Sequence, residues 1–200
     1  AYSTPEYDAA IESWFRHLAE TIKASLKAWN DNDYFGKQYY GSGAIGHSWG
    51  LMSIGYALKD ADLVNFAVDC IDNPRDFYDC MQGCILMEGD KLCERDNATL
   101  PAQNGEIYDR YRHATGPNKG LQSTSLTLQI LSCMARTLEN NGLNVYGYTA
   151  PTGENLLYPY EFYADFYATC YTVPDTGLKG GYYSGEESRI GKAGDMCGLF

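Results

Sequence analysis

The sequence predicts an all-α protein built from stacked helical hairpins. Apolar residues recur at the three-to-four-residue spacing of amphipathic helices along several segments of similar length. Loops rich in polar and aromatic residues separate these segments, and only residues 143–148 carry a weak strand signal. We expect residues 1–200 to form one domain with a Gly- and Tyr-rich, non-helical tail from about residue 171.

The first two expected helices span residues 5–29 and 45–58. Thr4 can cap the first helix, with Pro5 and Glu6 in its first turn. Its apolar residues follow helical spacing: Tyr7, Ile11, Trp14, Phe15, Leu18, Ile22, Leu26 and Trp29. The second helix is apolar nearly all round, as an inner, buried helix is, so we expect it in the core.

Two shorter helices and a long loop should follow. Asp60 can cap a helix that runs to residue 71, and residues 73–74 (Asn-Pro) can start another that reaches residue 87. Residues 88–119 show no regular periodicity. Loops of this length inside a compact protein are usually functional or disordered.

The last two expected helices span residues 121–138 and 154–169. The first of them should stop at Asn140-Asn141-Gly142, because glycine accepts the left-handed conformation that ends many helices. Thr152 is the expected cap of the second.

Cysteine content and charge indicate a secreted protein. The spacing of Cys80, Cys84 and Cys93 fits no zinc-binding pattern, so we expect no metal and at least two disulfides, with Cys80 and Cys84 bonded to different partners. Asn97-Ala98-Thr99 is a glycosylation acceptor sequence, which fits an oxidising, extracellular setting. The net charge of −11 disfavours nucleic acid and anionic membranes as partners. The seven cysteines are Cys70, Cys80, Cys84, Cys93, Cys133, Cys170 and Cys197.

A basic cluster within the long loop is the main candidate site. Arg110, Tyr111, Arg112 and His113 are consecutive, and Lys119 follows closely in an otherwise acidic chain. The cluster is either a solvated basic loop or an anion-binding groove with His113 as a general base. Of the other histidines, His17 is expected on the surface, and His47 is either a core or capping residue or part of the site.

Several stretches, taken in order, resemble the alginate lyase superfamily of polysaccharide lyases, which are helical toroids. The resemblance implies an (α/α) toroid, or an incomplete arc of one with further helices before and after this chain. It covers roughly residues 5–174, with these segments: 29–33 (W-N-D-N-D), 53–69, 104–106 (N-G-E), 109–113 (D-R-Y-R-H), 120–122 (G-L-Q), 141–146 (N-G-L-N-V-Y), 161–164 (E-F-Y-A) and 173–174 (V-P).

The resemblance also implies a set of site residues. Asn32 stands where the family contacts the substrate carboxylate, with Ser42 as its competitor, and His113 stands in the family's histidine position. The expected catalytic residues are His113, Asn32, Tyr111 and Arg110, and the expected substrate-binding residues are Arg112, Lys119, His47 and Tyr163. Two positions depart from the family pattern: residues 109–110 read Asp-Arg where the family has Arg-Asp, and Asp33 replaces a Trp.

The implied activity is β-elimination on a uronate polymer. A lyase must remove the weakly acidic proton at C5, and neutralising the neighbouring carboxylate stabilises the intermediate. No cofactor is expected. The expected partners are an anionic polysaccharide and a second chain or segment that completes the toroid.

Two other functions stay open at the sequence level. A toroid glycoside hydrolase would need two carboxylates across a cleft. The candidates are Asp33, Glu106, Asp109 and Glu161. A secreted carbohydrate-binding protein without catalysis is the alternative from another class, and the reversed order at residues 109–110 favours it.

Overall fold

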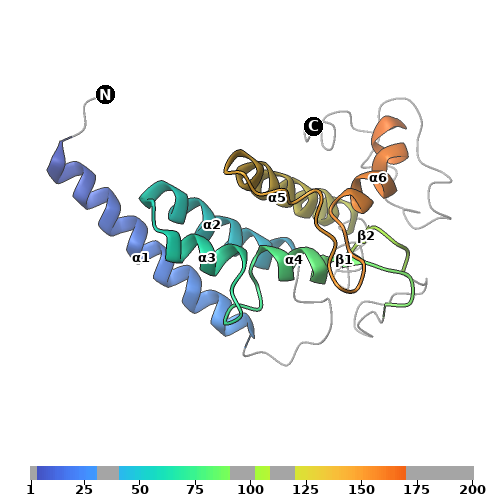
Figure 1. Cartoon of the computed structure of the whole chain (residues 1–200), viewed down its shortest axis with the longest axis horizontal. Coiled ribbons are helices and arrows are strands. Elements are labelled where there is room, and N and C mark those ends of the chain that lie inside the picture. The colour runs from blue at the N-terminus through green and yellow to red at the C-terminus, as the bar shows by residue number, and fades with distance from the viewer. Residues whose placement is uncertain (1–3, 31–40, 91–101, 109–119, 170–200) are drawn as a thin grey trace. The chain divides into compact units, whose positions relative to one another are not determined.

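The computed structural model describes residues 4–30, 41–90, 102–108 and 120–169, and these residues are mostly helical (Figure 1). This confirms the predicted all-α class. The elements of the described residues are α1 (Pro5–Asn30), α2 (Ser42–Leu58), α3 (Ala61–Val68), α4 (Phe77–Cys84), β1 (Ile85–Leu86), β2 (Glu106–Ile107), α5 (Gly120–Asn140) and α6 (Leu157–Thr169).

The described residues form two compact units. Unit 1 comprises residues 4–30 and 43–80, and unit 2 comprises residues 41–42, 81–90, 102–108 and 120–169. One boundary falls within α4, between Cys80 and Met81. No described helix has the length and apolar character that crossing a membrane requires.

In unit 1, α2 and α3 form a tight helical hairpin. Lys59 turns the chain with a φ of 56°, and the Asp60 carboxylate then caps α3 by accepting a hydrogen bond from the Leu63 N–H at 3.0 Å. A Cβ atom on Gly55 would lie 2.9 Å from the backbone nitrogen of Val64. The two helices therefore approach so closely that a side chain at position 55 would force Val64 to shift.

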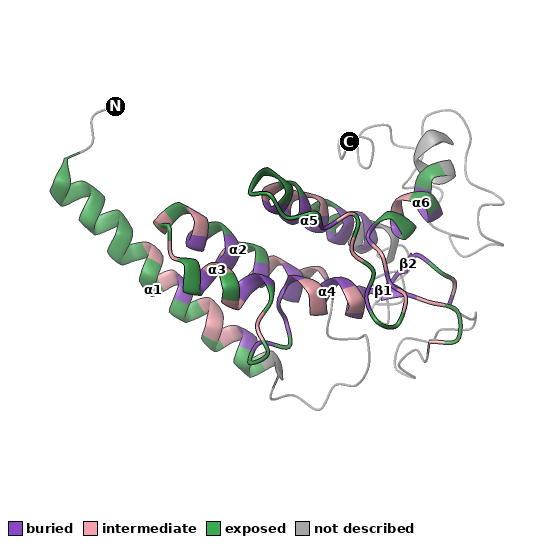
Figure 2. Ribbon diagram, viewed as in Figure 1, coloured by how far each residue is buried: buried purple, intermediate pink, exposed green. Residues whose placement is uncertain are grey.

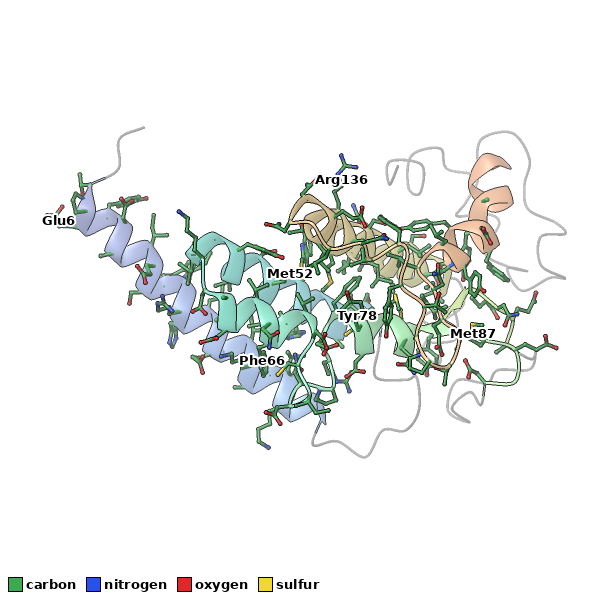
Figure 3. All side chains as sticks on the ribbon, in the orientation of Figure 1. Glu6, Met52, Phe66, Tyr78, Met87 and Arg136 are labelled. Carbon is green, nitrogen blue, oxygen red and sulfur yellow. The ribbon has the colours of Figure 1, made fainter. Side chains whose placement is uncertain are left out.

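The C-terminal half of α1 packs against this hairpin. Ala19 and Leu26 are buried, and a Cβ on Gly50 of α2 would meet the Ile22 side chain at 3.2 Å. At the edges of this contact, Arg16 forms an ion pair with Asp60 at 3.0 Å. The Lys23 ammonium lies 5.2 Å from the centre of the Phe66 ring, which is labelled in Figure 3. As predicted, α2 contributes to the core, through Ala44, Ile45, Ser48, Leu51, Met52, Ile54 and Gly55.

The helices around residues 69–76 differ from the prediction. α3 ends at Val68 rather than residue 71, and α4 spans residues 77–84 rather than 74–87. Asn73 does not cap α4, because its Oδ1 accepts from the Arg75 N–H at 3.2 Å, ahead of the helix, while its Nδ2 donates to the Phe66 carbonyl at 2.7 Å. Asp76 is the cap instead: its Oδ1 accepts from the Asp79 N–H at 2.8 Å and its Oδ2 from the Cys70 N–H at 2.7 Å.

Unit 2 contains a short antiparallel sheet that the sequence did not reveal. Ile85 of β1 pairs with Ile107 of β2, and Leu86 pairs with Glu106. Two residues per strand are too few to show the period-two pattern on which strand prediction depends. β2 also contacts both α5 and α6, so it lies at the centre of unit 2.

The ends of α5 and α6 test the predicted helix boundaries. α5 stops where predicted: Gly142 has a φ of 89°, and the Leu143 N–H bonds back to the Leu138 carbonyl at 3.0 Å. The weak strand expected at residues 143–148 is wrong, since this segment is irregular apart from a turn at residues 146–147. α6 begins at residue 157, where Asn155 accepts a hydrogen bond from the Leu157 N–H at 2.8 Å, so the prediction of Thr152 as cap was also wrong.

Candidate active site

Most of the predicted site residues lie outside the described residues. The described part of the chain includes His47 and Tyr163, together with Glu106 and Glu161 from the alternative carboxylate set. The residues outside it are Asn32, Asp33, Asn97, Asp109, Arg110, Tyr111, Arg112, His113 and Lys119.

Two of the motif segments pack against each other where β2 meets α6. A Cβ on Gly105 would lie 2.6 Å from the Tyr158 carbonyl oxygen, and Gly105 has a φ of 86°. Position 105 therefore requires glycine both for its conformation and for space. Next to it, the Ile107 N–H donates to the Tyr163 hydroxyl at 3.1 Å. Segments 104–106 and 161–164 form one contact, which we call the β2–α6 junction.

Tyr163 contributes a buried hydrogen bond to this junction. Its side chain has 0% exposure, and its hydroxyl accepts a hydrogen bond from the buried Ile107 N–H. In this arrangement Tyr163 holds α6 on β2 and presents no surface to solvent. The motif around Tyr163 predicts a substrate-binding role, and nothing in the sequence indicates this structural contact.

The two described carboxylates differ sharply in environment. Glu106 is fully buried, and its Oε2 accepts a hydrogen bond from the Gln103 N–H at 3.2 Å. Glu161 lies on the exposed side of α6. A glycoside hydrolase needs two carboxyl groups facing one cleft, and this difference in burial gives that alternative no support.

The N-terminal part of α5 adds buried hydroxyl groups that the sequence analysis missed. Thr124, Ser125 and Thr127 are all buried. The Thr124 hydroxyl has no hydrogen-bond partner among the described residues. Farther along α5, the Ser132 hydroxyl lies 2.5 Å from the Tyr160 hydroxyl of α6. The run Ser123-Thr124-Ser125 at a helix start was the available signal, because hydroxyl side chains usually face solvent.

The basic segment of residues 109–119 is held at both ends by this part of unit 2. It follows directly after Tyr108, which is fully buried beside β2, and it leads directly into α5 at Gly120. β2 and α5 contact each other. The segment that carries His113 therefore follows directly after the β2–α6 junction and precedes α5, a helix that also contacts β2.

His47 lies in unit 1 and bridges two helices. Its Nε2 is 3.0 Å from the Ser25 hydroxyl of α1, and its Nδ1 is 2.6 Å from the Gly43 carbonyl. A carbonyl oxygen can only accept, so Nδ1 carries the proton and Nε2 accepts from Ser25. His47 thus joins α1 to the first turn of α2 and is half-buried. This arrangement matches the structural alternative that the sequence left open for His47.

The described cysteines are reduced in this structure. No disulfide joins any two of Cys70, Cys80, Cys84 and Cys133. Cys80 is fully buried, and its thiol donates to the Arg75 carbonyl at 3.3 Å. Burial raises the pKa of Cys80 to about 12, so it stays protonated. The expected bonds from Cys80 and Cys84 to different partners are therefore absent from this structure. Cys93, Cys170 and Cys197 lie outside the described residues, and a disulfide among them stays a prediction.

Comparisons with known proteins add no assignment. No family model matches the sequence, and no curated protein or solved structure matches the chain. Among the residues that the structure describes, no group of three His, Cys, Asp or Glu side chains is placed to hold a metal ion.

Proposed function

We propose that this chain is a secreted polysaccharide lyase of the helical-toroid type, which cleaves a uronate polymer by β-elimination. The observation that carries the proposal is the β2–α6 junction. There the N-G-E and E-F-Y-A segments, which resemble two motifs of one lyase superfamily, pack against each other where Gly105 meets Phe162, and the Tyr163 hydroxyl bonds to the neighbouring Ile107 N–H. The basic segment that contains His113 starts beside this junction.

The motif residues within the described ranges have clear structural reasons to be what they are. Gly105 and Gly142 both have positive φ angles, which favour glycine. Val145 and Tyr163 are fully buried. The packing at these four positions supports the proposal, whereas the motif residues Asn144 and Glu161 are exposed and carry no such requirement. A complete toroid needs more helices than the described residues supply, and in this proposal further helices, from this polypeptide or a second one, complete it.

In the proposed reaction His113 removes the C5 proton of a uronate residue. The electron pair of the broken C5–H bond forms a C4–C5 double bond, and the C4–O4 bond breaks. Asn32 and Arg110 neutralise the carboxylate beside C5, which stabilises the negative charge that develops there. Tyr111 donates a proton to the departing O4. The products are an unsaturated uronate end and a new reducing end.

The remaining predicted residues divide between binding and scaffold. Arg112 and Lys119 supply positive charge that attracts a polyanion to a chain of net charge −11. In this proposal His47 and Tyr163 act through the scaffold, because each already makes a defined contact between two elements.

The test is the ultraviolet absorbance of unsaturated uronate products. The purified protein is incubated with alginate, polyglucuronate and polygalacturonate, and absorbance is followed over time. We expect product from one of these polymers and none from a His113→Ala variant. His17→Ala is the matched control, since His17 is exposed on α1, and it should keep full activity. Full activity in His113→Ala, or no product from any polyuronate with the wild-type protein, contradicts the proposal.

A carbohydrate-binding protein without catalysis is the second candidate. The observation that favours it is the order Asp109-Arg110, which reverses the Arg-Asp order of the family. Titration calorimetry with the same polymers separates the two functions. Binding that Arg110→Ala weakens, without any unsaturated product from the wild-type protein, would support binding and exclude lyase activity on those polymers.

A further inference from the structure

The chain contains two Asn-Gly pairs, Asn104-Gly105 and Asn141-Gly142. An asparagine side chain can react with the backbone nitrogen of the next residue, and a glycine at that position has no side chain to obstruct the approach. Because the nucleophile and the carbonyl carbon belong to one chain, the step is intramolecular and needs no enzyme. Both pairs therefore have the same chemical capacity, and their surroundings decide whether they react.

Asn141-Gly142 lies at the exposed end of α5. Both residues are exposed, and Figure 2 shows this end of the helix and the turn after it in green. The Asn141 amide donates to the Thr137 carbonyl at 2.8 Å, and the Gly142 N–H donates to the Glu139 carbonyl at 3.0 Å. A Cβ on Gly142 would meet nothing within 4 Å, so no neighbouring element holds this turn in place. Helix ends of this kind open at little cost in free energy, because water replaces their hydrogen bonds.

Asn104-Gly105 belongs to the β2–α6 junction and is held on both sides. Gly105 is buried, its N–H donates to the Leu86 carbonyl at 2.9 Å, and its Cβ position lies 2.6 Å from the Tyr158 carbonyl oxygen. The Asn104 side-chain oxygen accepts a hydrogen bond from the Glu88 N–H at 2.7 Å. Reaction at Asn104 would break both hydrogen bonds and move Gly105 against α6. It must therefore wait for unit 2 to open, which costs more free energy than fraying of a helix end.

We propose that Asn141 is a site of spontaneous deamidation in the folded protein and that Asn104 is protected. Hydroxide removes the proton from the Gly142 nitrogen, which then attacks the side-chain carbonyl carbon of Asn141. The new C–N bond closes a five-membered succinimide ring, and the side-chain nitrogen takes up a proton from water and leaves as ammonia. A water molecule then adds to either ring carbonyl and breaks its bond to the ring nitrogen. The products are aspartate and isoaspartate at position 141.

The product should weaken the last turn of α5. A carboxylate cannot donate a hydrogen bond, so the contact from residue 141 to the Thr137 carbonyl is lost. The new negative charge also lies at the C-terminal end of a helix, where the helix dipole disfavours it, and close to Glu139. Deamidation therefore makes the chain more acidic and loosens this end of α5 as the protein ages.

Peptide mapping by mass spectrometry tests the proposal on the purified full chain. The protein is kept for days in mildly alkaline buffer made with heavy-oxygen water, which labels each product when the ring opens, and is then digested in acidic buffer. We expect Asn141 to react at least about tenfold faster than Asn104, because the two sites differ in the free energy of local opening. The same measurement in urea that unfolds the protein should bring the two rates close together, since both asparagines precede glycine.

Equal rates at the two sites in the folded protein, or no labelled product at Asn141, would overturn the proposal. A difference in rate that persists in urea would also overturn it, because the cause would then be the neighbouring sequence and not the fold. Melting temperatures test the effect on α5. Asn141→Asp should melt at a lower temperature than Asn141→Ala, since both variants lose the amide donor and only the first adds a charge. Equal melting temperatures would contradict the predicted loosening of α5.

Discussion

The α2–α3 hairpin and the β2–α6 junction both bring two backbones into close contact at a glycine, but they do so by different means. In the hairpin, Gly55 lies within a helix and faces the backbone of Val64. In the junction, Gly105 faces the Tyr158 carbonyl and also has a φ of 86°. The hairpin needs only space at its glycine, whereas the junction needs space and a backbone conformation that other residues rarely adopt. The junction should therefore be the more sensitive of the two to single substitutions.

Gly105→Ala should have the largest effect on stability. Forcing alanine into the left-handed region costs about 1–2 kcal/mol, and the overlap of its Cβ with the Tyr158 backbone adds about 1–3 kcal/mol. Urea unfolding should show a loss within the sum of these ranges. Gly89→Ala is the control: Gly89 also has a positive φ, 91°, but it has open space around it, so it should show only the conformational cost. Equal losses in the two variants would mean that the close approach at Gly105 contributes nothing.

Asp76 is a buried carboxyl group in unit 1 that accepts hydrogen bonds from the Asp79 and Cys70 N–H groups. Burial raises the pKa of Asp76 to about 6 in the folded protein, from an ordinary value of 3.8. Between these values the folded state binds more protons than the unfolded state, so stability falls as pH rises through the window. The loss amounts to at most about 3 kcal/mol.

Unfolding free energies of the wild type and of Asp76→Asn, measured from about pH 4 to pH 7, test this prediction. The wild type should lose stability relative to the variant as pH rises. The variant also loses a hydrogen bond, but that cost does not depend on pH and shifts its curve without changing the slope. Parallel curves for the two proteins would contradict the raised pKa.

Tyr163→Phe should destabilise unit 2 by about 1–1.5 kcal/mol, because it removes the buried hydrogen bond from the Ile107 N–H to the Tyr163 hydroxyl. Tyr158→Phe is the control, since Tyr158 is partly exposed at 38%, and its effect should be small. If the protein is active, Tyr163→Phe should leave KM unchanged when assayed well below its melting temperature. A raised KM with unchanged stability would instead support the substrate contact that the sequence predicted.

Gly55→Ala should have the smallest net effect, a loss of about 1 kcal/mol. The added Cβ overlaps with Val64, but alanine favours the helix by about 1 kcal/mol relative to glycine. Gly50→Ala is the matched control: it meets only the flexible end of the Ile22 side chain, so it should be neutral or stabilising in the same unfolding assay. A larger loss for Gly55→Ala than for Gly105→Ala would reverse the proposed order of the hairpin and the junction.

Elements with local sequence signals were predicted well, and elements that depend on distant contacts were not. The first, second and fifth helices were predicted to within a few residues, because their apolar periodicity is long and their ends carry standard signals such as Pro5 and Gly142. The strands, the cap of α4 and the start of α6 were missed. Each depends on side chains that make contacts elsewhere in the chain, as when Asp76 caps α4 while it also accepts from the Cys70 N–H.

The candidate site shows the same limit. Motif resemblance selected Tyr163, but the environment that determines its role, the buried N–H of Ile107, belongs to a segment 56 residues away in the sequence. In the same way, the position of His47 between Ser25 and Gly43 depends on how α1 packs against α2. Local sequence could identify these residues as unusual, but it could not distinguish a scaffold contact from a substrate contact.

The most direct test of the proposed function is the mass of the products released from a polyuronate. Elimination leaves one end of each cut as an unsaturated uronate, so that fragment is lighter by one water molecule than the hydrolysis product of the same length. Mass spectrometry of oligosaccharides released by the wild-type protein should show these lighter fragments, and His113→Ala should release none. Fragments that carry the added water would identify a hydrolase, and an intact polymer after incubation with the wild-type protein would contradict the lyase proposal.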